Sequence, residues 1–196
     1  MSEILMQAIR IATDAHSEQV RKYSGRPYIE HPARVAMMAS SNSYFIRESN
    51  YADLYDGDLT FEKIIAAAWL HDVIEDCDDT YNNMIYDLDE TGVVLALVEG
   101  LTNTTIPTDG NRMHRIKLDH LRISKQNHII RMLKAMDILD NVSDMDGADK
   151  GFLLKYLDET HLLIDALTSS YFPDTELMLD LQQEVTNQRE MLEIPF

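Results

Sequence analysis

Apolar residues recur along almost the whole chain at spacings of three and four residues. This is the spacing of one face of an α-helix, and alternation typical of strands is scarce. We therefore expect an all-α fold of eight or nine helices. The pattern places these helices at residues 2–20, 31–42, 60–76, 80–90, 91–102, 109–124, 127–145, 149–169 and 174–193.

Signals at the predicted helix ends support this division. Thr60, Thr80 and Asp109 each precede a predicted helix and carry side chains that commonly cap helix N-termini. The segment 43–60 is rich in tyrosine and acidic residues and has few periodic apolar positions. It is predicted to be a long loop, and loops of that length in compact domains tend to be functional or mobile.

The length of 196 residues suits one domain with a full core. We expect a single domain over residues 1–196, with helices in 149–193 that close the core or form a homodimer. The longest apolar runs are shorter than the roughly 20 residues of a membrane span, and Glu3 argues against a signal peptide. Cys77 is the single cysteine, so an intramolecular disulfide is excluded and a cytoplasmic protein is predicted.

The net charge of −17 argues against nucleic acid as a partner, because nucleic-acid binders usually carry a basic surface. Basic residues nevertheless concentrate in two segments. Such local charge attracts a small anion such as a phosphate, although a solvated helix face is the alternative. The longer segment contains Arg112, Arg115, Lys117, Arg122, Lys125, Arg131 and Lys134. The shorter one contains Arg21, Lys22, Arg26 and Arg34.

The stretch HDVIED, residues 71–76, follows the apolar run IIAAAW. In a continuous helix, His71, Asp72, Glu75 and Asp76 would share one arc of about 140°. Three carboxylates there repel one another, and a divalent cation relieves this repulsion while taking a lone pair from His71. The alternative is a solvated acidic end of a helix.

Two further residues are candidates to complete a metal site. His31 opens a predicted helix and precedes Pro32, a residue suited to the first helical turn. Asp137 lies beside an apolar stripe, where a charge is costly unless it is paired or bound to a metal. Two histidines and two aspartates suit Mn, Fe, Co or Zn with open positions for water and substrate. Buried polar residues with a structural role are the alternative.

These residues match the H…HD…D pattern, so the chain resembles the HD-domain superfamily of metal-dependent phosphohydrolases. Four segments, in order within residues 4–145, are similar to signatures of the RelA/SpoT hydrolase domain. The chain ends before a nucleotide-synthetase domain could begin, so it looks like a stand-alone small alarmone hydrolase. The segments are AHSEQVRKYSGRPYIEHPARVA (15–36), AAAWLHDVIEDC (66–77), ALVEGLTN (96–103) and KAMDILDN (134–141).

The resemblance implies a manganese-dependent enzyme and a small nucleotide as its substrate. The implied reaction removes the 3′-pyrophosphate of guanosine 3′-diphosphate 5′-di- or triphosphate and yields GDP or GTP. Some single-domain relatives instead remove the 2′-phosphate of NADPH. A non-catalytic nucleotide-binding protein is the alternative of a different class.

Residue roles follow from the same resemblance. His31, His71, Asp72 and Asp137 would hold Mn²⁺ or another divalent transition metal, and Glu75 and Asp76 would orient and deprotonate the attacking water. The substrate would be contacted by Arg21, Lys22, Lys134 and Asn141.

The chain departs from the family near the last metal aspartate, at Ile138, Asp140, Val142, Ser143 and Asp144. These departures concern the nucleotide pocket, so they put the substrate in doubt more than the reaction type. Outside the motifs, His16 is expected to be a hydrogen-bonded core residue and His120 a helix-face residue.

Overall fold

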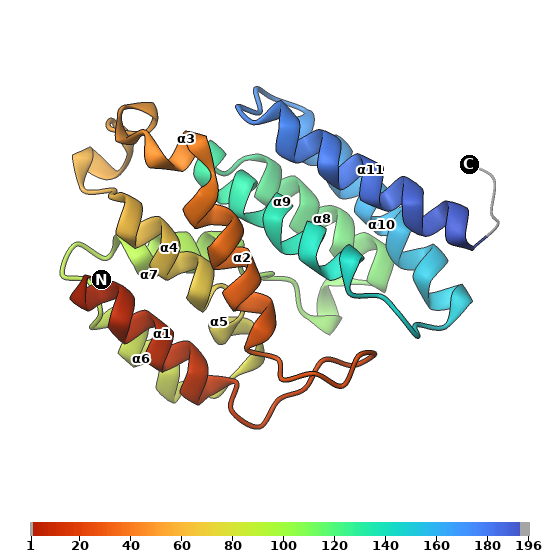
Figure 1. The fold of residues 1–196 in the computed structure, drawn as a ribbon, viewed down its shortest axis with the longest axis horizontal. Coiled ribbons are helices and arrows are strands. Elements are labelled where there is room, and N and C mark those ends of the chain that lie inside the picture. Colours follow the sequence, from red (N-terminus) through yellow and green to blue (C-terminus); the bar gives the residue numbers. More distant parts are fainter. Residues whose placement is uncertain (1, 193–196) are drawn as a thin grey trace. The chain divides into compact units, whose positions relative to one another are not determined.

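The computed structural model describes residues 2–192, and within them the secondary structure is helical apart from one isolated antiparallel bridge between Val20 and Pro27. The predicted all-α class is therefore confirmed (Figure 1). The chain divides into two compact units. Unit 1 contains residues up to 21 and 25–102, and unit 2 contains residues 22–24 and those from 103 onward.

Unit 1 is built around α4 (Phe61–Leu70), which packs against α1, α2 and α7. Six of the ten residues of α4 are buried, because its alanines let the neighbouring helices approach closely. The remaining elements of this unit are α1 (Glu3–Ala15), α2 (Glu30–Ser41), α3 (Ser43–Ile46), η1 (Glu48–Asn50), η2 (Leu54–Gly57), α5 (Val73–Asp76), α6 (Thr80–Tyr86) and α7 (Val93–Leu101).

Unit 2 is built around α9 (His128–Ser143), which packs against α11, α10 and α8. Most residues of α9 are buried, including Asp137 and Asp140. The surrounding elements are η3 (Pro107–Asp109), α8 (Arg112–Ser124), α10 (Lys150–Thr168) and α11 (Thr175–Met191). Among the described residues, no helix is both long enough and apolar enough to span a membrane.

Each predicted helix corresponds to an observed one, but two of the three predicted caps are wrong. Thr60 caps α4 by accepting a hydrogen bond from the Lys63 amide. Thr80 lies inside α6, where its amide and hydroxyl donate to Asp78. Asp109 belongs to η3, and Asn111 caps α8 instead. The errors arise because several neighbouring residues in these stretches have capping side chains.

The segment 43–60 is more ordered than the predicted loop. Asn42 caps α3 by accepting from the amides of Tyr44 and Phe45. Phe45 and Tyr51 are buried, and the Tyr51 hydroxyl donates to the Phe45 carbonyl at 2.7 Å. These two aromatic side chains anchor the segment in the core, which the weak periodicity of its sequence did not indicate.

The predicted continuous helix over 60–76 is interrupted at His71 and Asp72, between α4 and α5. The ring of His71 donates from Nδ1 to the carbonyl of Ala68 at 2.8 Å. In a continuous helix that carbonyl would accept from the amide of Asp72. Competition of a side chain for a backbone acceptor favours a break at this point.

We expect Asp89 to stabilise unit 1 in a pH-dependent way. Burial alone would raise the pKa of Asp89, but hydrogen bonds from Thr91, Val94 and Lys63 outweigh it and lower the pKa below 3.8. The stabilisation is therefore present above the ordinary aspartate pKa and is lost as the pH falls through the lowered value. Asp89→Asn should lower the free energy of unfolding by about 1–3 kcal/mol at pH 7.

Urea denaturation of both proteins between pH 7 and pH 3 measures this difference. The difference between the two proteins should shrink below the ordinary aspartate pKa, because the unfolded wild-type chain then takes up a proton that the folded carboxylate resists. An equal difference at both ends of the range would contradict the assignment.

Candidate metal centre

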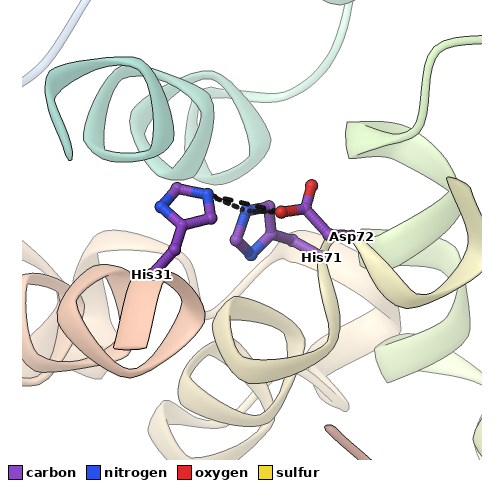
Figure 2. Close-up of side chains that lie close together, drawn as sticks. All are labelled: His31, His71 and Asp72. Atoms are coloured by element: carbon purple, nitrogen blue, oxygen red, sulfur yellow. Dashed lines mark hydrogen bonds and ion pairs between the residues drawn. The ribbon is translucent and has the colours of Figure 1, made fainter. Parts of the chain in front are cut away.

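His31, His71 and Asp72 converge within unit 1 (Figure 2). The Nε2 atoms of the two histidines are 3.2 Å apart. Oδ2 of Asp72 lies 3.3 Å from Nε2 of His31 and 3.2 Å from Nε2 of His71. Both imidazoles are buried, and the carboxylate keeps slight contact with solvent. Two imidazole nitrogens and one carboxylate oxygen therefore lie close together in a largely buried site.

Local structure sets the direction of each ring. His31 lies in the first turn of α2, and its amide donates to the Tyr28 carbonyl at 2.9 Å. His71 follows the last residue of α4. Because a carbonyl can only accept, Nδ1 of His71 carries a proton, and Nε2 of the same ring faces Nε2 of His31 and Oδ2 of Asp72. Metal binding requires Nε2 to carry no proton, and its lone pair then points to the place where the three residues meet.

The donor set fits a divalent transition metal. Ligands about 2.1 Å from one ion are separated by roughly 3.0–3.4 Å for octahedral to tetrahedral bond angles. The three separations observed here lie inside that range. The hydrogen bond to Ala68 is the kind of outer partner that metal-binding histidines use to hold their tautomer.

Glu75 and Asp76, the acidic pair, lie on α5, which begins directly after Asp72. Glu75 is exposed, whereas one oxygen of Asp76 is 3.1 Å from the Tyr28 hydroxyl. Asp76 keeps contact with solvent, but partial burial raises the pKa of its carboxyl above 3.8. The charge of Asp72 raises this pKa further, while the Tyr28 hydroxyl lowers it.

Tyr28 is a residue of this site that the sequence reasoning missed. Its hydroxyl lies 2.8 Å from Oδ2 of Asp72 as well as near Asp76. The available signal was its place three residues before His31 in the quoted motif PYIEHP.

Asp137 lies in unit 2 and is buried in α9. Lys134 Nζ donates to its Oδ2 at 2.8 Å, and Asn141 Nδ2 donates to its Oδ1 at 2.7 Å. The two partners are one turn before and one turn after Asp137, so the helix itself orients the carboxylate. Its role as the fourth metal ligand stays a prediction.

Arg21 and Lys22, two of the predicted substrate contacts, belong to different units. The Arg21 guanidinium lies 5.6 Å from the centroid of the Tyr28 ring in unit 1. In unit 2, the Lys22 ammonium lies 5.1 Å from the ring of Tyr23 and 5.0 Å from that of Phe152. Both cations are therefore placed over aromatic faces, an arrangement that favours positive charge.

Lys134 also lines a small cavity of unit 2, of about 140 Å³. His120 forms part of its wall, and burial together with the charge of Lys134 lowers the pKa of its imidazole below 6.5. The lowered pKa favours the neutral form of His120, and its place in a cavity wall was not predicted from the sequence. The other lining residues are Asn103, Ile116, Asp119, Ile123, Ile138 and Leu163.

The basic segment 112–134 does not act as one charged face. Arg131 is buried and donates to the carbonyls of Leu167 and Tyr171, so it holds the end of α10. Arg112 forms a bidentate pair with the buried Glu159. At least these two of the seven cations are used inside unit 2, which corrects the expectation that the whole segment serves an anion.

Comparison with known proteins finds relatives that are named as guanosine nucleotide hydrolases. It is 28% identical over 144 residues to guanosine-3′,5′-bis(diphosphate) 3′-pyrophosphohydrolase MESH1 of Danio rerio, covering 73% of this chain and 69% of that protein. It is 31% identical over 157 residues to the bifunctional (p)ppGpp synthase/hydrolase SpoT of Escherichia coli, covering 80% of this chain and 17% of that protein. The chain thus spans less than a fifth of the length of this bacterial relative. No family model matches the chain.

A solved structure shows the same fold. It is described as a metazoan orthologue of SpoT that hydrolyses ppGpp, and it superposes with a TM-score of 0.74 at 24% identity. The match covers 96% of this chain and 97% of the other. Together with the sequence relatives, it confirms the resemblance to the RelA/SpoT-type HD hydrolases.

We expect Mn²⁺ to stabilise the wild-type protein through the three converging residues. A ligand at 100 times its Kd adds about 2.7 kcal/mol to the free energy of unfolding. His71→Ala should lose most of this gain, and His161→Ala, which alters an exposed histidine of α10, should keep it. Thermal unfolding with and without excess Mn²⁺ measures the effect, and equal shifts in all three proteins would contradict the site.

Proposed function

We propose that this chain, a homologue of the RelA/SpoT-type HD hydrolases, removes the 3′-pyrophosphate from guanosine 3′-diphosphate 5′-di- or triphosphate. The products are GDP or GTP and pyrophosphate. The observation that carries the proposal is the convergence of His31, His71 and Asp72 beside the acidic pair on α5. Relatives named for this reaction support the choice of substrate.

His31, His71, Asp72 and Asp137 hold a divalent metal in this proposal, and Mn²⁺ is the metal we favour. Once bound, such an ion supplies Lewis-acid charge that polarises a phosphoryl oxygen and acidifies water. The hydrogen bonds from Lys134 and Asn141 to the two oxygens of Asp137 support its role, because they fix the direction of the carboxylate.

Asp76 and Glu75 orient and deprotonate the attacking water. One of them takes a proton from the water, and the water oxygen forms a bond to the phosphorus attached to the ribose 3′-oxygen. The bond between that phosphorus and the 3′-oxygen breaks, its electron pair stays on the 3′-oxygen, and this oxygen takes up the proton that the carboxylate removed from water as pyrophosphate leaves. The position of α5 directly after Asp72 supports this assignment.

Arg21, Lys22, Lys134 and Asn141 contact the nucleotide. Arg21 and Lys22 are supported by their cationic groups over aromatic rings, which restrict their motion without neutralising them. A small anionic substrate can be bound by local basic groups even though the chain as a whole has a net charge of −17. A cytoplasmic location and a homodimer remain predictions from the sequence.

The purified protein with Mn²⁺ should release pyrophosphate from guanosine tetraphosphate faster than it releases phosphate from NADPH or GTP. Asp72→Ala should bind Mn²⁺ weakly and lose turnover, because it removes one of the three converging donors. Ion-exchange chromatography of the products and calorimetry with Mn²⁺ measure both. Turnover of NADPH alone would contradict the guanosine substrate, and no turnover of any nucleotide by the metal-loaded protein would contradict the enzyme.

Asp76→Asn should lower kcat about 10²–10⁴-fold, the range typical of a lost general acid or base. KM and Mn²⁺ affinity should change little, since Asp76 is not among the converging donors. Asp78→Asn, which alters an exposed carboxylate two residues further on, is the matched control. An Asp76→Asn enzyme as active as this control would exclude Asp76 from the proton transfer.

A further inference from the structure

The hydroxyl group of Tyr28 lies between two carboxylates of different predicted function. It is 2.8 Å from Oδ2 of Asp72 and 3.1 Å from Oδ2 of Asp76. The Asp72 oxygen is the same atom that lies 3.2–3.3 Å from the two histidine Nε2 atoms. A phenol has one proton to donate, so one donor serves both carboxylates.

Tyr28 is brought to this point by a short hairpin. The Tyr28 amide donates to the Gln19 carbonyl at 2.9 Å, and the Arg21 amide donates to the Arg26 carbonyl at 2.8 Å. Gln19 also donates from Nε2 to the carbonyl of Asp76 at 3.0 Å. The same hairpin therefore holds Asp76 twice, once at its backbone and once at its carboxylate.

The ring of Tyr28 is held independently of these hydrogen bonds. Its centroid is 4.9 Å from that of His16 and 5.8 Å from that of His31. His16 is buried, as expected from the sequence, and its Nδ1 lies 2.7 Å from Oε1 of Gln19. These ring contacts therefore help to fix the position of the hydroxyl oxygen independently of the two carboxylates.

We infer that Tyr28 is a positioning residue for the hydrolytic reaction, an inference that rests on the proposed function. Its hydroxyl orients Asp72 for metal binding and holds Asp76 beside Asp72 for proton transfer from water. Two neighbouring carboxylates repel each other, and a donor between them makes their close approach less costly. Tyr28 acts through these two residues and does not itself contact the reacting atoms.

Tyr28→Phe is the test, because it removes the hydroxyl and keeps the ring contacts. Loss of an outer partner of a metal ligand typically costs 10–100-fold in metal affinity or activity. We expect a loss of about that size in Mn²⁺ affinity, measured by calorimetry, and a similar loss in kcat at saturating Mn²⁺. KM for the nucleotide should be unchanged. A wild-type value of either the Mn²⁺ affinity or kcat overturns the joint role.

Tyr44→Phe is the matched control. Its hydroxyl donates to the Asn50 carbonyl at 3.3 Å, so the same atom is removed from a structural contact. This variant should keep wild-type Mn²⁺ affinity and kcat. If it loses as much as Tyr28→Phe, the effect belongs to general destabilisation and the inference fails.

A double mutant separates positioning from structure. If Tyr28 acts on kcat through Asp76, Tyr28→Phe should lower kcat little further in an Asp76→Asn background at saturating Mn²⁺. If the two substitutions lower kcat by factors that multiply, this part of the inference is overturned. Absence of wild-type turnover would contradict the proposed function instead, and the Mn²⁺ affinity of Tyr28→Phe would then still decide whether Tyr28 orients Asp72.

Discussion

The hydrogen bond from the His71 ring to the Ala68 carbonyl determines two features of unit 1 at once. It occupies a backbone acceptor at the end of α4, where the helix stops and Asp72 begins a new turn. It also places a ring proton on Nδ1, so that Nε2, which faces His31 and Asp72, is the nitrogen that can bind a metal. The end of a helix and the chemistry of a metal ligand thus depend on one contact.

In each unit, carboxylate groups are held by partners of defined geometry. In unit 1, Tyr28 and Gln19 both hold Asp76 of α5, and Tyr28 also holds Asp72. In unit 2, the partners of Asp137 are one turn away on its own helix. Such arrangements offset the desolvation of charged groups, and they preserve the direction of each lone pair before a ligand is bound.

The basic residues of this acidic chain have two distinct uses. Arg131 and Arg112 stabilise unit 2, because a buried guanidinium can satisfy several carbonyl or carboxylate oxygens at once. Arg21 and Lys22 instead lie over aromatic rings. Counting charge along the sequence could not separate these uses, since burial and partner choice are properties of the folded chain.

Periodicity and ordered motifs in the sequence are local properties, and they were sufficient for the helical class, the order of the helices and the identity of the candidate metal-binding residues. His31, His71 and Asp72 were candidate metal ligands from the sequence alone, and the structure brings their side chains together. Only the tertiary structure decided that α4 stops at Leu70, that Phe45 and Tyr51 anchor the segment 43–60, and that Tyr28 joins Asp72 to Asp76. These features depend on side chains competing for backbone groups and on contacts between residues up to 48 positions apart, which no local pattern encodes.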